Sequence, residues 1–456
     1  MVENVFNQSI WGDEGFSAIL SMKPLPEIIK IISKDTSPPL WNLTEWLVFK
    51  TLGTDEIYIR GLSLFFFFGA AIFTYKIGSF CWSRKTGFWA LILTILNPFF
   101  FIYAFEGRMY SIMALGVTAS NYFFLRIFYN EEKVRQRDKI GYFFFTLWAL
   151  YSHHFAIFNI FIQILWWFYE LIFGKRNRAK KMFKLFLITG LGYTPWLIPL
   201  YNQTKMVSGG FWLGKPNSND LINLIFDYLA CGIKNTNLKI PILNKPLYEI
   251  GLYLVFATLI LRKWWKNFKK TLFQILCFLG PIILTWLISQ NFQSIFFNRY
   301  LLYTIPSAMI ILASSRSKIS IVPLSTLVIL FGIIDYNYFT HPQKLPFRQY
   351  SEYVKSQLKE GDFLINWNSS SHHLWETKYY GIPAPIYIPP HGGELPFFVG
   401  TALMEKEDII REIPKDIKRL GVITSGPIEE IVLTDYTQIS LKEFKNLKFI
   451  LYEKSK

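Results

Sequence analysis

The apolar residues of this chain gather into long blocks, and these blocks constrain the fold more than any other feature. Each block holds about 15–20 residues, the length that an α-helix needs to cross a lipid bilayer. Phe alone contributes 44 of the 456 residues. We place ten spans, at about 62–80, 87–104, 109–128, 140–152, 155–173, 183–201, 246–262, 271–290, 300–314 and 319–338. The sequence therefore predicts an α-helical polytopic membrane protein.

The excess of basic residues follows a membrane pattern as well. The net charge is +16, but from Lys344 to Lys456 there are 15 basic and 15 acidic residues, so the excess lies before this tail. It is concentrated in alternate loops between the apolar blocks: 84–85, 133–139, 175–181, 262–270 and 316–318. Because basic loops stay in the cytoplasm, we expect these five on the inner face. Charges with this role do not indicate a nucleic-acid-binding surface.

The other loops are then expected outside, and they carry the polar residues best suited to chemistry. They include Asp13-Glu14, residues 105–110, 153–154 and 298–299, and the tail. This orientation predicts a multi-pass plasma-membrane protein with its active site on the extracytoplasmic face. It also puts the N-terminus outside although no apolar segment precedes Asp13, so we expect a hydrophobic helix upstream of the sequence.

The tail is a different kind of sequence. Short apolar runs at 363–367, 385–388, 422–424 and 448–452 are typical of strands. We expect helices between them at 347–358, 373–380 and 406–420. Strands that alternate with helices indicate a small α/β domain. The predicted organisation is therefore a membrane-embedded domain over residues 1–341 and an extracytoplasmic α/β domain over 342–456.

Two adjacent carboxylates, Asp13 and Glu14, lie in the polar segment Trp11-Gly-Asp-Glu-Gly-Phe-Ser17. An isolated pair of this kind most often caps a helix, and a general base or a metal ligand is the functional alternative. Asp35 and Glu106 fall on the same predicted face. Since carboxylates beside a membrane are costly without a cavity or a partner, this coincidence favours a shared site.

Glu106 and Arg108 stand between two strongly apolar blocks with Tyr110 close by, and Arg299 lies at the mouth of a later span. An internal ion pair at a helix break is one interpretation. The other is phosphate binding, because a guanidinium group forms bidentate, charge-assisted hydrogen bonds with phosphate oxygens.

His153 and His154 are candidates for shaping the site. Either could ligate a divalent metal together with Asp35 or Glu106, although adjacent histidines on a helix point apart. The three cysteines have no CxxC spacing and are expected to be ordinary core residues. No other cofactor is indicated.

Five motifs, in order along the chain, resemble the GT-C membrane glycosyltransferases. They are Trp11-Gly-Asp-Glu-Gly-Phe-Ser17, Asp35-Thr-Ser-Pro-Pro-Leu40, Leu96-Asn-Pro98, Glu106-Gly-Arg-Met-Tyr110 and Asn298-Arg-Tyr300. The nearest subgroup is the family-39/83-like one, with protein-mannosyltransferase, aminoarabinose-transferase and lipopolysaccharide galacturonosyltransferase relatives. The resemblance covers residues 9 to about 310. The sequence departs from the group in the absence of the usual first span and at His153-His154.

The resemblance implies helices around a cavity that opens to the outer face and to lipid. It also implies a donor sugar carried on a polyprenyl phosphate, and an acceptor that is a glycan, a lipid or a protein of the cell envelope. By analogy the catalytic base is Asp13 with Glu14 beside it, Asp35 shapes the acceptor or metal side, and the donor phosphate region is lined by Glu106, Arg108, Tyr110 and Arg299.

A mechanism follows from the same residues. Two arginines can hold the charge of the departing polyprenyl phosphate while one carboxylate takes the proton of the attacking hydroxyl. These groups suffice for a single displacement with inversion, and no Gly-rich nucleotide loop is present.

Two other functions stay open at this stage. One is a transporter or flippase of a lipid-linked or anionic substrate, with Asp13, Glu106 and Arg108 as gating charges. The other is a scaffold whose outer domain binds a partner. Transporters often show repeated halves and charges near the middle of the membrane. No repeat is visible here and the charges gather at one face, which favours an enzyme.

Overall fold

The computed structural model describes residues 3–130, 134–231, 238–240, 243–261, 267–314, 319–390 and 392–455. Parts of the predicted inner loops, including Lys133 and residues 262–266 and 316–318, lie outside the described residues. The chain forms two compact units. The membrane unit comprises Ser37–Trp41 and Arg60–Thr340, and the α/β unit comprises Met1–Thr36, Asn42–Ile59 and His341–Lys456.

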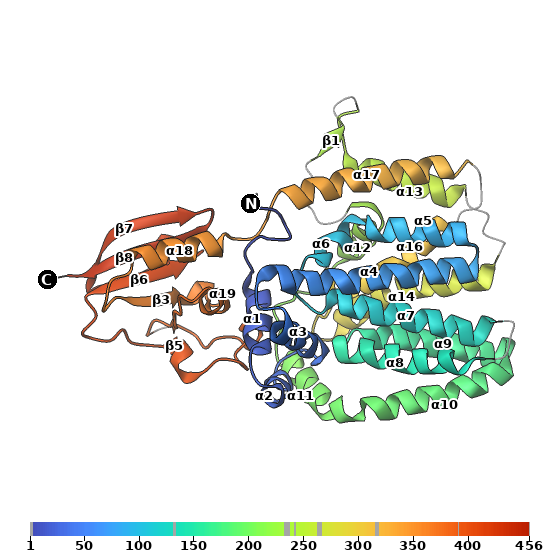
Figure 1. Cartoon of the computed structure of the whole chain (residues 1–456), viewed down its shortest axis with the longest axis horizontal. Coiled ribbons are helices and arrows are strands. Elements are labelled where there is room, and N and C mark those ends of the chain that lie inside the picture. The colour runs from blue at the N-terminus through green and yellow to red at the C-terminus, as the bar shows by residue number, and fades with distance from the viewer. Residues whose placement is uncertain are drawn as a thin grey trace. The chain divides into compact units, whose positions relative to one another are not determined.

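The membrane unit is a bundle of helices that run alongside one another (Figure 1). It contains most of α4 (Glu56–Cys81), followed by α5 (Arg84–Ile95), α6 (Pro98–Ala104), α7 (Tyr110–Tyr129), α8 (Gln136–Ser152), α9 (Ala156–Phe173), α10 (Arg176–Tyr193), α11 (Leu197–Ser208), α12 (Ser218–Phe226), α13 (Leu247–Ile260), α14 (Phe268–Asn291), α15 (Asn298–Leu301), α16 (Ile305–Ala313) and α17 (Ile321–Thr340). A two-stranded ribbon, β1 (Lys239–Ile240) and β2 (Lys245–Pro246), precedes α13.

All ten predicted spans fall on helical segments of this unit. In the described part of the chain, six helices are long and apolar enough to cross a membrane, and a seventh span is formed if α5 and α6 are counted as one bent pair. The protein is therefore a multi-pass membrane protein, as the apolar blocks predict.

The bend between α5 and α6 measures 63° and has a local cause. Pro98 cannot continue α5 because it lacks a backbone N–H, and it disfavours helical backbone at the residue before it. Asn97 is accordingly extended, and its side chain accepts a hydrogen bond from the Phe100 N–H to begin α6.

Buried polar side chains connect α7, α8 and α9. Asn121 and Asn159 exchange two hydrogen bonds of 3.0 and 3.1 Å, and the Gln163 amide donates to both Ser120 and Asn121. Tyr142 in turn donates to Gln163. Such networks join helices in lipid, where the hydrophobic effect does not draw them together.

The α/β unit is built on a six-stranded mixed sheet. Its strands are β3 (Phe363–Trp367), β4 (Ile386–Tyr387), β5 (Ile409–Ile410), β6 (Arg419–Thr424), β7 (Tyr436–Phe444) and β8 (Leu447–Lys454), in the order β5-β4-β3-β6-β8-β7. The β3, β4, β5 and β6 pairings are parallel, while β8 pairs antiparallel with β6 and β7. Two helices, α18 (Phe347–Gln357) and α19 (His373–Tyr379), lie within the same part of the chain (Figure 1).

The tail matches its predicted helices at α18 and α19 and its four predicted strands, but the helix predicted at 406–420 is wrong. Residues 406–408 form a 3₁₀ turn, 409–410 form β5, and β6 already begins at Arg419. Pro414 interrupts this segment and cannot supply the backbone N–H that a helix interior requires. Strand β7 was not predicted, because most of its side chains are exposed on both faces and it lacks the apolar run of a buried strand.

Three N-terminal helices, α1 (Gly12–Ser21), α2 (Leu25–Ile32) and α3 (Leu40–Thr51), precede the bundle. The predicted membrane-embedded domain, residues 1–341, includes residues 1–59. Most of them belong instead to the same compact unit as residues 341–456. Helix α1 packs against α19 of the tail, so this compact unit joins segments that are far apart in the chain.

Candidate active site

The acidic pair occupies the first turn of α1. Trp11 is the N-cap in extended backbone conformation, and its N–H donates to the Glu14 carboxylate at 3.4 Å. Carboxylates in this position stabilise a helix because they meet its unsatisfied N–H groups and the positive end of its dipole. The capping role that the sequence left open is thus filled by Glu14.

Glu14 also forms a buried ion pair. Its carboxylate is fully buried and lies 2.7 Å from the Lys344 ammonium group, whose side chain is 14% exposed. The same ammonium group lies over the Trp11 ring, 5.9 Å from its centre. Asp13, by contrast, is only partly buried. The two neighbouring carboxylates therefore differ in environment, and Asp13 is the one with access to solvent.

Two glycines bring α1 into close contact with α19. A Cβ atom added at Gly15 would lie 3.0 Å from the backbone carbon and the Cβ of Trp375, and one added at Gly12 would lie 3.3 Å from the Cβ and carbonyl oxygen of His372. The Phe16 ring then meets Trp375 edge to face at 5.4 Å. This contact explains both glycines of the Trp11–Ser17 segment, since larger residues would separate the helices.

Titratable side chains stand at the start of α19: His373 and Glu376 are buried, whereas His372, the residue before the helix, keeps an exposed face. Burial raises the pKa of Glu376 to about 8, while the backbone N–H of Gly12 and the charge of His372 act in the opposite direction. Burial lowers the pKa of His372, against the attraction of Glu376 and Asp13. His373 hydrogen-bonds through Nε2 to the Ser425 hydroxyl at 2.9 Å, and burial lowers its pKa to about 3. Asp13 and Glu376 therefore both act on the same histidine, His372.

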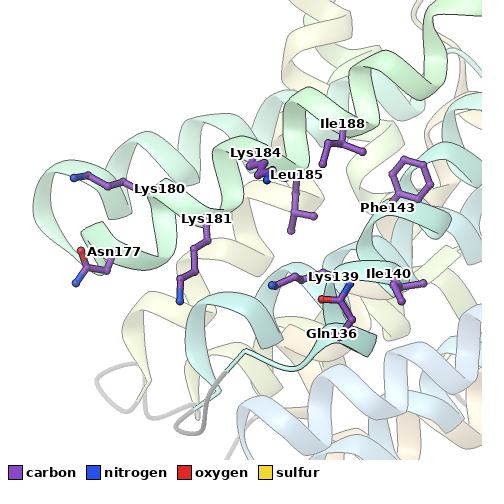
Figure 2. Close-up of a pocket in the computed structure, with 10 residues that line it drawn as sticks. All are labelled: Gln136, Lys139, Ile140, Phe143, Asn177, Lys180, Lys181, Lys184, Leu185 and Ile188. Atoms are coloured by element: carbon purple, nitrogen blue, oxygen red, sulfur yellow. The ribbon is translucent and has the colours of Figure 1, made fainter.

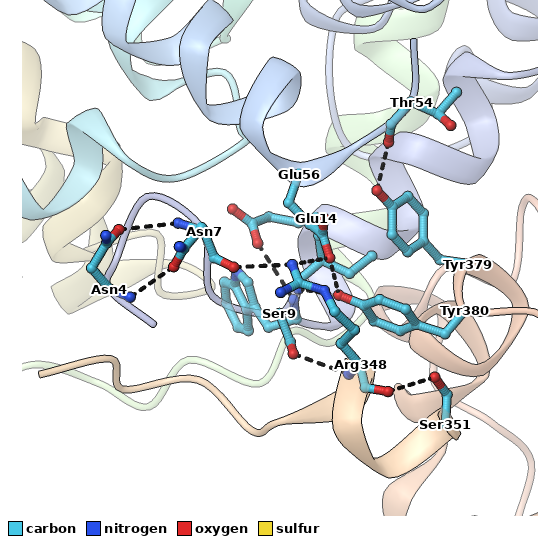
Figure 3. A network of polar contacts seen from close by, with 12 residues as sticks. Asn4, Asn7, Ser9, Glu14, Thr54, Glu56, Arg348, Ser351, Tyr379 and Tyr380 are labelled. Atoms are coloured by element: carbon cyan, nitrogen blue, oxygen red, sulfur yellow. Dashed lines mark hydrogen bonds and ion pairs between the residues drawn. The ribbon is translucent and has the colours of Figure 1, made fainter. Parts of the chain in front are cut away.

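A polar network holds the segment before α1 in place (Figure 3). Arg348 donates from its guanidinium group to the Asn7 carbonyl at 3.0 Å and pairs with Glu56 at 2.8 Å, while its backbone N–H donates to Ser9. The Tyr380 hydroxyl donates to Glu56 and accepts from the Ile10 N–H. These contacts tie residues 4–10 and 54–56 to α18 and α19, and they position the start of α1.

Asp35 belongs to the same unit. It follows α2, its side chain is buried, and its N–H donates to the Ile32 carbonyl. The structure thus brings Asp13, Glu14 and Asp35 into one compact unit, whereas Glu106 lies in the other.

The second group of predicted residues gathers within the membrane unit. The Arg299 guanidinium lies 3.7 Å from the Glu106 carboxylate, and both side chains are at most 14% exposed. Glu106 and Arg108 share a tight turn after α6, in which the Arg108 N–H donates to the Glu106 carbonyl at 2.7 Å. Glu106 is thus ion-paired with Arg299, a residue of a distant loop.

Aromatic rings surround the Arg299 guanidinium. Its central carbon lies 5.7 Å from the centre of the Tyr110 ring, 5.0 Å from Phe297 and 6.0 Å from Tyr300. Rings at these distances attract a cation and screen it from bulk water. Phe297 and Tyr300 flank the Asn298-Arg299 pair in sequence, and their spacing could have indicated this cage.

The two histidines point in different directions because the chain is extended at His153, after α8 ends. His153 stacks near Tyr300, with ring centres 5.0 Å apart, and its Nδ1 accepts from the Phe155 N–H at 3.1 Å. Burial, His154, and the positive charges of Arg108 and Arg299 hold the pKa of His153 well below its usual value. The neutral ring therefore carries its proton on Nε2.

His154 is engaged by the protein itself. Its Nε2 lies 2.7 Å from the Gln203 side-chain oxygen and its Nδ1 lies 3.5 Å from the Tyr193 hydroxyl. Burial lowers its pKa to about 4. With both nitrogens occupied, His154 fits a structural role better than metal binding. Among the residues that the structure describes, no group of three His, Cys, Asp or Glu side chains is placed to hold a metal ion.

Several residues of these two clusters were not predicted. Lys344 and Glu376 stand in the tail, hundreds of residues from α1, and Tyr300 appeared only as part of the Asn298-Arg-Tyr300 motif. The helix expected at 373–380 does begin at His373. The sequence carries no signal that pairs Lys344 with Glu14, because that contact depends on how the chain folds back.

The structure resembles solved membrane enzymes along nearly its whole length. ArnT from Cupriavidus metallidurans in the apo state matches with a TM-score of 0.57 at 10% identity, over 98% of this chain and 94% of that one. The same protein bound to undecaprenyl phosphate matches with a TM-score of 0.59 at 11% identity, over 98% and 95%. The Archaeoglobus fulgidus oligosaccharyltransferase in complex with Zn and sulfate matches with a TM-score of 0.51 at 11% identity, over 91% and 64%.

No family model matches the sequence, and no curated protein matches it. At 10–11% identity the structural likeness establishes the fold. The predicted fold class is confirmed: a GT-C-like bundle of membrane helices joined to a small C-terminal α/β domain.

Proposed function

We propose that this chain is an integral-membrane glycosyltransferase that moves a sugar from a polyprenyl-phosphate-linked donor to a cell-envelope acceptor. The observation that carries the proposal is the Arg299 cluster, a guanidinium group held by Glu106 at 3.7 Å and enclosed by Tyr110, Phe297 and Tyr300. The likeness to ArnT with bound undecaprenyl phosphate supports a donor of this class. We place the site on the extracytoplasmic face, on the grounds of the loop charges.

In this proposal Arg299 and Arg108 bind the donor phosphate. A guanidinium group offers several N–H donors in one plane, which suits the oxygens of a phosphate. Glu106 orients Arg299, and the aromatic rings lower the local dielectric so that the charge interaction is strong. Tyr110 and His153, whose Nε2 carries the proton, are further hydrogen-bond donors for phosphate oxygens or sugar hydroxyls.

Asp13 is the proposed base. It is partly exposed, whereas the Glu14 carboxylate is occupied by Lys344, so we assign proton abstraction to Asp13 alone. The acceptor hydroxyl gives its proton to Asp13 as its oxygen attacks the anomeric carbon. The bond between that carbon and the phosphate oxygen breaks, and the electron pair leaves with the polyprenyl phosphate, whose charge the arginines stabilise. One displacement of this kind inverts the anomeric configuration.

The experiment begins with lipid-linked-sugar profiles of membranes with and without the gene. The proposal expects a polyprenyl-phosphate sugar to accumulate when the gene is absent. That lipid fraction then serves as the donor for the purified chain in nanodiscs, with binding and transfer measured separately. Accumulation of no lipid-linked sugar would contradict the proposal.

Variants of Asp13 and Arg299, each with a matched control, separate proton abstraction from donor binding. D13N should retain donor binding and lose transfer by at least about 100-fold, the low end of what a general base contributes. The control D55N removes an exposed carboxylate of the same unit and should leave transfer unchanged. R299A should weaken donor binding, and R84A, at an exposed arginine, should not. Passage of the donor across the bilayer without sugar transfer would identify a flippase instead.

A further inference from the structure

A half-open groove lies between α8 and α10, at the end of the bundle where both helices begin (Figure 2). It has a volume of about 900 Å³. Helix α8 contributes Gln136, Lys139, Ile140 and Phe143, and α10 contributes Asn177, Lys180, Lys181, Lys184, Leu185 and Ile188. Both sets recur at intervals of three and four residues, so each lies along one face of its helix.

The two helices are in close contact near their other ends. A Cβ atom at Gly192 would lie 2.7 Å from the Leu147 side chain, and the Tyr151 hydroxyl donates to the Gly192 carbonyl at 3.1 Å. Near the start of α10 the contacts run to α9 instead, where Trp167 donates to the Ala179 carbonyl at 2.7 Å. The face of α10 that carries the lysines is therefore left to line the groove.

The groove is polar at one end and apolar at the other. In both helices the lysines come first and the apolar residues follow toward the middle of the span (Figure 2). Lys181 and Ile188 are seven residues apart on α10, which at 1.5 Å per residue is about 10 Å along the axis. This spacing matches the separation between a lipid headgroup at the ammonium groups and acyl chains beside Ile140, Phe143, Leu185 and Ile188.

The charge of the groove is of one sign. Four of its ten lining residues are lysines and none is acidic. The acidic residue next to Lys139 in sequence, Asp138, is buried and already paired with Arg126 at 2.8 Å. The four positive charges favour an anion, and the apolar residues beside them favour one that also carries an apolar chain.

We infer that this groove binds an anionic glycerophospholipid, with the phosphate at the lysines and an acyl chain against the apolar residues. Basic pockets between membrane helices on the cytoplasmic side are suited to such headgroups, and the loop charges predict that this end of the bundle faces the cytoplasm. The site lies within the membrane unit and is separate from the Arg299 cluster, so the inference does not depend on the proposed enzyme activity.

Fluorescently labelled phosphatidylglycerol and phosphatidylcholine, titrated against the full chain in a neutral detergent, test the inference. Phosphatidylglycerol should bind more tightly. The variant K181Q/K184Q should weaken its binding by roughly 25-fold, from about fivefold per lysine. The control R84Q/K85Q removes the same charge from two exposed residues at the start of α5 and should change binding less than twofold. Both variants alter exposed side chains and should unfold at the same temperature as the parent.

A second experiment tests the apolar half of the groove and asks which anion the groove binds. I188N should weaken binding of the long-chain lipid but not of a water-soluble glycerophosphoglycerol, which lacks acyl chains. Three results would overturn the inference: equal affinity for the two phospholipids, equal loss in both charge variants, or displacement of phosphatidylglycerol by inorganic phosphate at comparable concentration. Preferential displacement by polyprenyl phosphate would also overturn it, because the groove would then be a carrier site.

Discussion

The α/β unit should lose stability as the pH rises toward 8, and replacing Glu376 by Gln should remove this loss. Glu376 lies on α19 beneath the start of α1, and burial raises its pKa to about 8 from an ordinary value of 4.5. The folded chain therefore holds a proton at this carboxyl at neutral pH, and the unfolded chain does not. Glu376→Gln keeps the shape and cannot ionise.

The sign of the effect follows from proton linkage. Between pH 4.5 and 8 the folded state binds one more proton at Glu376 than the unfolded state does, so this contribution to the free energy of unfolding falls by about 1.4 kcal/mol per pH unit. It is fully present below pH 4.5 and is lost as the pH rises through 8. His373 acts in the opposite direction, because its pKa is lowered to about 3 from 6.5 and the folded state gains stability as the pH rises between these values.

Together the two groups predict a profile with three parts. Stability should rise from pH 3 to 4.5, stay nearly level to 6.5 where the two slopes cancel, and fall from 6.5 to 8. The fall spans about 1.5 pH units and amounts to about 2 kcal/mol. His372, whose pKa is also lowered from 6.5, adds a rise that ends at pH 6.5, so the middle part of the profile slopes upward.

Hydrogen exchange of the α1 and α19 amides in the detergent-solubilised chain measures this effect. After correction for intrinsic exchange rates, the free energy of opening should fall by about 2 kcal/mol between pH 6.5 and 8 in the parent and stay level in E376Q. E360Q, at an exposed carboxyl of the same unit, serves as the control and should behave as the parent. Parallel slopes in the parent and E376Q would refute the claim that Glu376 is protonated in the fold.

Two more predictions concern the contacts of α1. Gly15→Ala puts a methyl group 3.0 Å from the Trp375 backbone, so the free energy of opening in the exchange assay should fall by about 1–3 kcal/mol. The control Gly61→Ala, which would have no atom within 4 Å of its new methyl group, should leave stability unchanged. Equal effects of the two variants would contradict the packing argument. Glu14→Gln leaves the Lys344 ammonium without its 2.7 Å ion pair and should cost about 3 kcal/mol at pH 7. Thermal unfolding of E14Q beside the double variant E14Q/K344M checks this, since the second change should restore much of the loss.

Much of the fold could be predicted from local sequence. In lipid a chain must satisfy its backbone hydrogen bonds within each segment, so an apolar block of sufficient length becomes a helix whatever surrounds it. All ten predicted spans are helical for this reason, and the four apolar runs of the tail are strands. The helix predicted at 406–420 did not form: the segment contains Pro414 and is divided between a 3₁₀ turn and two strands.

The candidate site was predictable in part. The motifs around Asp13, Glu106, Arg108 and Arg299 contain residues that lie at helix starts and breaks in the structure. The resemblance of these motifs to GT-C glycosyltransferases agrees with the observed fold. The division of roles within each motif was not predictable. Asp13 and Glu14 are neighbours in sequence, yet only Glu14 is buried against a lysine.

What the sequence determined by itself is the apolar helices of the bundle and the class of the fold, because these depend on hydropathy and backbone chemistry within short segments. The tertiary structure alone decided the ionisation of Glu376, the pairing of Glu14 with Lys344 and of Glu106 with Arg299, and the divergent directions of His153 and His154. Burial and ion pairing depend on which distant segments exclude water from a group, and that is a property of the folded chain.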